Sequence, residues 1–261
     1  MAFPPILELV APATIFLLQA PVVYFGSRAL KLRPTAPTIP YPRKELNTVI
    51  FVVIALFIAV SILNIVERTV LAPYYQVSYP PFDPIDVLWW IAFYAVISPP
   101  MLLAMKRTTQ GLASIGVSTK DGARLLILGL GMGMTQFTIA LLLAPLVGRG
   151  LAAFTLATVY ALVALTVGGF AEEIVWRGYI QTRLVAHSGM VKGLLGASLL
   201  FAFWHFPARY FQYGVDGGLA SSVTFLPTGL IFGFVMLRAQ NIIPGSIFHV
   251  SWNLVAAVLF V

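Results

Sequence analysis

Apolar residues run in long stretches along this chain, and short polar segments separate them. About 20 consecutive apolar residues are needed for a helix to cross the hydrocarbon core of a bilayer. Eight stretches approach or exceed that length, and we expect a transmembrane helix in each. Their approximate ranges are 6–27, 47–66, 85–105, 124–146, 151–185, 191–207, 219–238 and 242–260. The pattern therefore predicts an all-α, polytopic membrane protein with about eight transmembrane helices.

Two of these stretches depart from a simple span. Pro99 and Pro100 interrupt the third stretch, because proline lacks the N–H that continues a helix. The fifth stretch contains no proline from Leu151 to Val185, which is long for one crossing. We expect that helix either to tilt strongly or to protrude from the membrane.

Composition supports the membrane assignment. Hydrophobic residues make up 59% of the chain and charged residues only 10%, with a mean hydropathy of +0.92. A soluble domain is nearer 25% charged. The chain has no cysteine, which excludes disulfides, thiolate metal sites and a cysteine nucleophile. We expect a single transmembrane domain over 1–261 in a multi-pass integral membrane protein, located in the cell membrane if the source is prokaryotic.

The net charge of +7 is spread over alternate loops rather than gathered in one patch. This spread favours membrane orientation over nucleic-acid binding, so no nucleic-acid partner is expected. The first, third, fifth and seventh loops are predicted to be cytoplasmic, and the N-terminus external. Their basic residues are Arg28, Lys31, Arg33, Arg43, Lys44, Lys106, Arg107, Lys120, Arg124, Arg183, Lys192 and Arg238, whereas the other loops hold only Arg68, Arg149 and Arg209.

Two further segments have a local pattern of their own. The third loop, at 107–124, is mildly amphipathic, so it either lies on the membrane interface or is an ordinary connection. The small residues of "GLGMG" at 129–133 suit close helix packing rather than nucleotide binding. No internal repeat is evident, which disfavours a transporter because many transporters are built from repeats.

Ionisable side chains inside the predicted spans are concentrated in the C-terminal half. Each costs on the order of 2.5–3.5 kcal/mol on insertion scales, so each one needs an explanation. The polar groups in question are Glu172, Glu173, Arg177, His205, His249 and Asn253. His187, in "AHSG" at a loop, is expected to be solvated and to have no role.

The spacing of these groups indicates how they are arranged. Glu173 and Arg177 are four residues apart, so they share a helix face and can pair. Glu172 points about 100° away from Glu173 and is free for another task. His249 and Asn253 are again four apart and project from one stripe of the last span.

These residue types support two kinds of hydrolytic site. A carboxylate with an imidazole can activate water as a general base and then protonate a leaving amine, while imidazole and amide N–H groups stabilise an oxyanion. Alternatively, two histidines and one glutamate can hold zinc with an open position for water. Each group also has a structural alternative: an ion pair for Glu173 with Arg177, and hydrogen bonds between helices for His205, His249 and Asn253.

Three motifs resemble those of a known family. "EEIVWR" at 172–177 resembles the EExxxR signature of the CAAX protease and bacteriocin-processing (Abi) membrane proteases, which include Rce1-type prenyl-protein endopeptidases. "FAFWH" at 201–205 and "HVSWN" at 249–253 match the second and third motifs, FxxxH and HxxxN, in the same order. The resemblance covers about 124–260 as a catalytic core, whereas the spans and loops of 1–123 carry no family signal.

The resemblance implies roles for the motif residues. Glu172 would be the general base, with His205 positioning the water, and His249 with Asn253 would form the oxyanion site. Glu173 and Arg177 would support the architecture. This mechanism needs no cofactor, and zinc at the same site remains the alternative.

The resemblance also implies an activity, which we carry forward as a hypothesis. The chain would be an intramembrane endopeptidase acting on a peptide or lipidated protein substrate at the bilayer, and Rce1-type members cut near a prenylated cysteine. Two rival hypotheses are a non-proteolytic immunity or scaffold protein on the same fold, and a proton- or ion-coupled transporter that uses the same residues as a relay.

Overall fold

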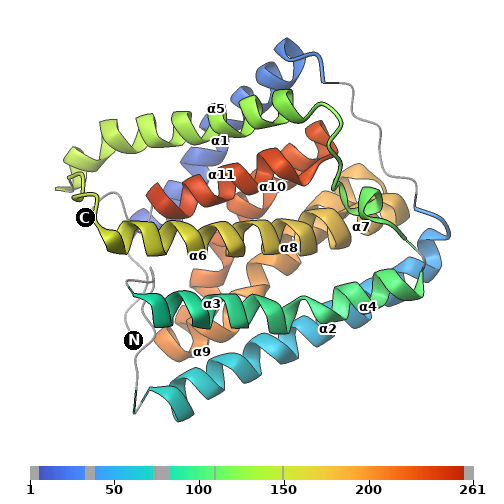
Figure 1. Cartoon of the computed structure of the whole chain (residues 1–261), viewed down its shortest axis with the longest axis horizontal. Coiled ribbons are helices and arrows are strands. Elements are labelled where there is room, and N and C mark those ends of the chain that lie inside the picture. The colour runs from blue at the N-terminus through green and yellow to red at the C-terminus, as the bar shows by residue number, and fades with distance from the viewer. Residues whose placement is uncertain are drawn as a thin grey trace.

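The computed structural model describes residues 6–32, 39–72, 74, 83–108, 110–148 and 150–255. Its regular elements in these residues are all helices, most of them running roughly antiparallel to their sequence neighbours (Figure 1). The predicted all-α membrane architecture is confirmed. Arg33, Arg149 and the last part of the eighth predicted span lie outside the described residues.

The N-terminal half contributes five α-helices and three short turns of other helix types. In chain order they are α1 (Ile6–Ala29), α2 (Pro42–Ile65), η1 (Val66–Leu71), α3 (Pro84–Ile97), α4 (Pro99–Arg107), η2 (Leu112–Ile115), α5 (Gly122–Leu143) and η3 (Ala144–Val147). The break between α3 and α4 falls at Pro99, as the sequence predicts, because the ring of a proline cannot fit inside a continuing helix.

The C-terminal half carries the motif residues. Its elements are α6 (Leu156–Glu173), η4 (Ile174–Gln181), α7 (Thr182–Ser188), α8 (Met190–Trp204), α9 (Phe206–Val223), α10 (Phe225–Ala239) and α11 (Ile242–Leu254). Here α6, η4 and α7 form one continuous rod, which is the long fifth stretch of the sequence.

Five helical segments of the described residues are long and apolar enough to cross a membrane. They are Pro42–Leu71, Pro84–Arg107, Gly122–Leu143, Leu156–Ser188 and Phe206–Ala239. Four of the eight predicted spans therefore need correction or qualification. The first, α1, is not among the five, and the side chains of its first residues lie outside the described part of the chain. The sixth is a shorter apolar helix of 15 residues, α8. The seventh begins earlier than 219, because α9 and α10 together make a 34-residue segment. The eighth is described as a helix of only 13 residues, α11.

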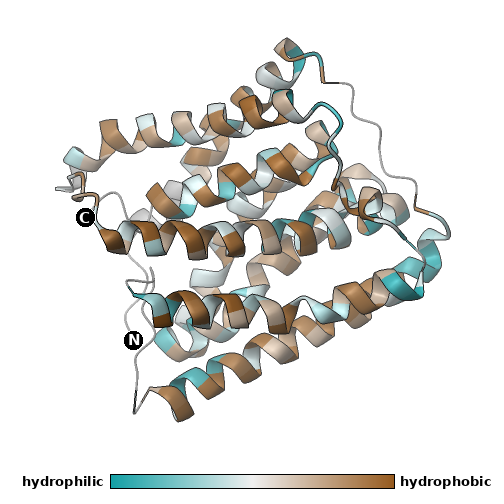
Figure 2. Ribbon diagram, in the orientation of Figure 1, coloured by the Kyte–Doolittle hydropathy of each residue, from teal (hydrophilic) through white to brown (hydrophobic). Residues whose placement is uncertain are grey.

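The odd-numbered loops meet at one end of the bundle. Arg183 on α7 pairs with Glu45 at the start of α2, with 3.4 Å between Nε and Oε2. Gln110 in the third loop donates to the other oxygen of Glu45 at 2.7 Å. Asn241 in the seventh loop donates to the Ser118 carbonyl at 2.8 Å. These contacts place the basic loops together, at the right-hand, more hydrophilic end in Figures 1 and 2. The cytoplasmic assignment of that end stays a prediction.

The third loop is anchored to the bundle through one residue. Ile115, in η2, is 2% exposed and belongs to the main apolar core. A Cβ on Gly178 of η4 would lie 2.5 Å from the Ile115 carbonyl oxygen, so glycine is required for this approach. Leu112, in the same turn, is 61% exposed, and the interfacial placement of the loop stays a prediction.

The small residues at 129–133 pack α5 closely against α11, as predicted. A Cβ on Gly129 would lie 2.9 Å from Ile247 Cβ and 3.0 Å from Pro244 Cα. Gly133 approaches Ser251 in the same way, one turn further along. Helix α11, which carries His249, is thus held against α5 by backbone contact.

This contact predicts the effect of adding one methyl group. Gly129→Ala should lower the free energy of unfolding by about 1–3 kcal/mol, because the Pro244 backbone cannot yield. Gly131→Ala is the matched control, since its Cβ would meet nothing within 4 Å. Thermal unfolding in detergent checks both variants, and equal stabilities would contradict the packing described.

Candidate active site

The two motif glutamates lie where the rod α6–η4–α7 changes its winding. Helix α6 ends at Glu173, and η4 continues as a π-helix over Ile174–Gln181. π-helical turns are rare and occur frequently at functional sites. Both α3 and α11 pack against α6, which places the glutamates between the N-terminal helices and the C-terminal motif helix.

Glu173 and Arg177 form the ion pair that their spacing predicts. Arg177 Nε lies 3.5 Å from Glu173 Oε2, and the two side chains are 2% and 1% exposed. The Arg177 guanidinium also lies over the Phe201 ring at 4.1 Å and the Phe232 ring at 5.3 Å. Paired charge and two ring faces offset part of the desolvation cost of a buried guanidinium.

His249 lies between the two glutamates. Its Nδ1 is 3.1 Å from Glu173 Oε1, and because a carboxylate only accepts, Nδ1–H is the donor. Its Nε2 is 3.9 Å from Glu172 Oε2. The imidazole stacks on Phe232, with 4.5 Å between centroids. Glu173 therefore orients the ring so that Nε2 faces Glu172.

Glu172 is held at one oxygen and free at the other. Oε1 accepts a hydrogen bond from the Tyr94 hydroxyl at 2.8 Å. Oε2 has no hydrogen-bond donor among the described residues, and it is the oxygen that faces His249. The Glu172 side chain as a whole is 12% exposed, against 1% for Glu173, although Oε2 itself is buried. The two adjacent carboxylates thus differ in environment: Glu173 is committed to Arg177 and His249, and Glu172 has an available acceptor.

Tyr94, on α3, is a site residue that the sequence reading missed. It lies in an apolar span rich in aromatic residues, and nothing in its spacing distinguishes it from a packing residue. Its approach depends on Gly168, one turn before Glu172: a Cβ there would lie 2.7–2.9 Å from three atoms of the Tyr94 ring. No signal in the sequence could have found it, because its place beside Gly168 follows only from the fold.

His205 lies at the junction of α8 and α9 rather than inside one helix. Its Nδ1 is 2.9 Å from the Phe201 carbonyl, so Nδ1–H donates and Nε2 is left as the functional nitrogen. The ring stacks on Phe225, with 3.7 Å between centroids. Phe201 contacts both imidazoles, with centroids 5.0 Å from His205 and 6.5 Å from His249.

The structure brings some predicted site residues together more closely than others. Glu172, Glu173, Arg177 and His249 form one contact network. His205 joins it through the Phe201 ring. Asn253 lies one turn beyond His249 on α11 and is partly exposed. His187 is exposed, as expected, but it lies in the last turn of α7 rather than in a loop.

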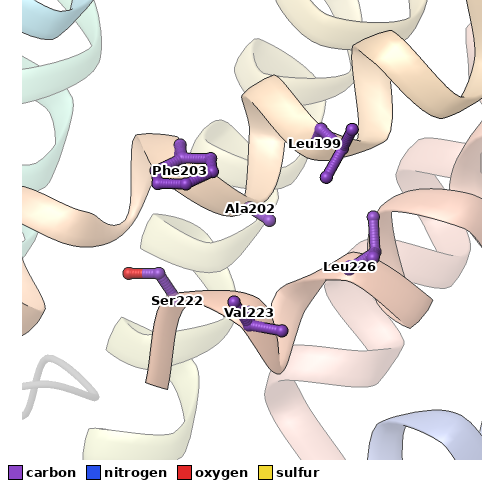
Figure 3. Close-up of a pocket in the computed structure, with 6 residues that line it drawn as sticks. All are labelled: Leu199, Ala202, Phe203, Ser222, Val223 and Leu226. Carbon is purple, nitrogen blue, oxygen red and sulfur yellow. The ribbon is translucent and has the colours of Figure 1, made fainter. Parts of the chain in front are cut away.

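Metal ligation and cavities were the other open questions at this site. Within the described part of the chain, no group of three His, Cys, Asp or Glu side chains is placed to hold a metal ion. A small apolar cavity of about 30 Å³ lies between α8 and the α9–α10 junction, lined by Leu199, Phe203 and Leu226 among others (Figure 3). It contains no site residue, and its apolar lining offers a water no partners. The predicted polar intramembrane cavity stays a prediction.

Fold and site together define a class: a helical membrane protein with carboxylates and imidazoles clustered between its helices. Residues 154–255 match the family model of Rce1-like type II CAAX prenyl endopeptidases. The chain is also 30% identical over 93 residues to the CAAX prenyl protease 2 of Methanococcus maripaludis, an alignment that covers 32% of this chain and 34% of that relative. The chain thus aligns with about a third of the length of this curated relative. No solved structure matches.

The predicted family resemblance is confirmed, and the matched segment contains all three motifs. It begins later than the core expected at 124–260, and Tyr94 lies outside it. The division into a catalytic core and N-terminal spans, like the single domain over 1–261, remains a prediction.

The buried ion pair predicts an asymmetry between variants. Arg177→Met alone should lower the free energy of unfolding by about 3–5 kcal/mol, because it leaves the Glu173 charge buried without its partner. The double variant Glu173→Gln/Arg177→Met should recover part of that loss. Unfolding in detergent micelles measures both, and a double variant less stable than Arg177→Met would contradict the pairing.

Proposed function

We propose that the chain is an intramembrane endopeptidase in which Glu172 is the general base. The observation that carries this proposal is the free Glu172 Oε2, which faces His249 Nε2 while the other oxygen is held by Tyr94. An ionised carboxylate with an unused acceptor beside an imidazole can deprotonate water. The match to a family of endopeptidases supports the same reading.

The proposed reaction uses one water and one peptide bond. Glu172 takes a proton from the water. The water oxygen attacks the peptide carbonyl carbon at the same time, and the carbonyl oxygen becomes an oxyanion. The C–N bond then breaks, and the proton on Glu172 passes to the leaving nitrogen. His205 Nε2, left free by the bond from Nδ1, would hold the attacking water.

Oxyanion stabilisation is proposed for His249 and Asn253, which share one face of α11. His249 Nε2 can donate only when the ring is protonated, because Nδ1 already donates to Glu173. Glu173 therefore acts through His249 and Arg177 rather than on the substrate.

The substrate is proposed to be a protein whose C-terminus carries a prenylated CAAX-type sequence. The support is the name of the matched family and of the archaeal relative. The zinc alternative would need a ligand beyond Glu172 and His249, for which the motifs offer His205, because Glu173 is already engaged with Arg177 and His249. A non-proteolytic scaffold is the remaining alternative, and activity measurements separate these three.

Cleavage of a quenched farnesylated CAAX peptide by purified protein in detergent tests the proposal. Glu172→Gln should lower kcat by about 10²–10⁴-fold, because the general base is lost. Glu67→Gln, which changes a glutamate in η1, the π-helical turn that follows α2, is the matched control and should retain activity. Activity that survives chelation supports the metal-free mechanism, whereas loss on chelation with recovery in zinc supports the metal alternative.

The histidines offer a second matched pair. His205→Gln should lower kcat by about 10²-fold or more, since the water loses its proposed partner. His187→Gln should leave kcat unchanged, because that exposed side chain lies at the far end of the rod. Equal activities of the two variants in the peptide assay would remove His205 from the mechanism.

A further inference from the structure

We propose that Tyr94 is a positioning residue for Glu172, supplied by the part of the chain that precedes the family-matched segment. Its hydroxyl fixes one carboxylate oxygen, so that the other faces His249 and the reacting water. This inference rests on the proposed function and deepens it, because it adds a residue that none of the three motifs contains.

The first support is that the two oxygens of Glu172 have different contacts. The Tyr94 hydroxyl donates to Oε1 at 2.8 Å, a normal length for such a bond. Oε2 has no donor among the described residues and lies 3.9 Å from His249 Nε2. A carboxylate tethered at one oxygen cannot rotate freely, so its remaining lone pairs keep one direction.

The second support is the space made for the tyrosine ring. A Cβ on Gly168 would lie 2.7 Å from Cε2, 2.8 Å from the hydroxyl oxygen and 2.9 Å from Cζ of Tyr94. Gly168 is buried on α6, four residues before Glu172, where glycine costs helix stability relative to alanine. The absence of a side chain at Gly168 lets the hydroxyl reach Glu172 across the surface of α6.

The third support is the fixed orientation of the ring. Tyr94 is buried and packs in an aromatic cluster on α3, with centroids 5.3 Å from Phe93 and 6.1 Å from Trp90. Phe93 in turn contacts Trp204 of α8, at 6.4 Å. The Tyr94 ring is therefore packed by two α3 neighbours, one of which is itself held by α8, as expected of a residue that positions a catalytic group.

The chemistry of the donor suits this role. A phenol hydroxyl donates to a carboxylate without carrying a charge, so it fixes one oxygen without forming an ion pair. An arginine at the same place could bind both oxygens of the carboxylate at once. Tyr94 therefore holds Glu172 in one orientation and leaves Oε2 available.

The experiment compares Tyr94→Phe with wild type in two assays. In peptide cleavage, kcat should fall about 10–100-fold with KM within about two-fold, because a hydrogen bond to a charged group is lost while substrate contacts remain. In the second assay, an apolar carbodiimide labels protonated carboxyl groups, and mass spectrometry reports the site. Labelling at Glu172 should become several-fold faster in Tyr94→Phe, since Oε1 is no longer engaged by the Tyr94 hydroxyl and the carboxyl group can turn toward the reagent.

Two controls separate an effect on the position of Glu172 from a general effect on folding. Tyr179→Phe removes a hydroxyl from another fully buried tyrosine, on η4, and should change neither assay. Labelling at Glu173, which stays paired with Arg177, is the internal reference within Tyr94→Phe. Gly168→Ala should reproduce the effects of Tyr94→Phe, because the added methyl displaces the ring.

The outcomes distinguish this inference from the protease proposal. Unchanged labelling at Glu172 in Tyr94→Phe overturns the positioning role, and so does an unchanged kcat in an enzyme whose wild type is active. If wild type cleaves no peptide but labelling at Glu172 responds, the protease proposal fails while the Tyr94–Glu172 contact is supported.

Discussion

Burial of one guanidinium constrains most of the C-terminal half. Arg177 lies in a region where an unpaired charge would cost several kcal/mol, so its surroundings must compensate. Glu173 supplies the counter-charge from the same rod. Phe201 of α8 and Phe232 of α10 supply ring faces. His249 of α11 donates to the other oxygen of Glu173. Four helical elements are thereby fixed relative to one another, and Glu172, next to this network, takes its position from it.

The pattern of polar and apolar residues predicts much of this arrangement, because a membrane makes each polar group conspicuous. The helical class, the pairing of Glu173 with Arg177 and the close packing at Gly129 follow from spacing alone. The alternation of basic loops predicts that they share an end, and contacts such as Arg183 with Glu45 confirm it. The ion pair lies within one helix, and the packing at Gly129 depends on the spacing of small residues. The helical class and the shared end of the loops depend on patterns of hydropathy and charge that repeat along the chain.

Interactions between distant segments were harder to predict. The limits of the sixth and seventh spans differ from the prediction because α9 is helical although it contains Arg209, Gln212 and Asp216, polar residues that are typical of a loop. The contact of Tyr94 with Glu172 joins residues 78 positions apart. A tyrosine in an aromatic-rich span has no periodic signature, and only the three-dimensional placement of Gly168 against its ring distinguishes it.

The origin of Tyr94 on α3 has a consequence for how relatives of this chain should be compared. The similarity over 154–255 covers the motif helices. The hydrogen bond from Tyr94 that positions Glu172 comes from outside that segment. Two proteins can therefore share every motif and still differ in the environment of the same carboxylate. Sequence changes in the helices that precede the matched segment can then alter the reactivity of that carboxylate while the motif residues stay unchanged.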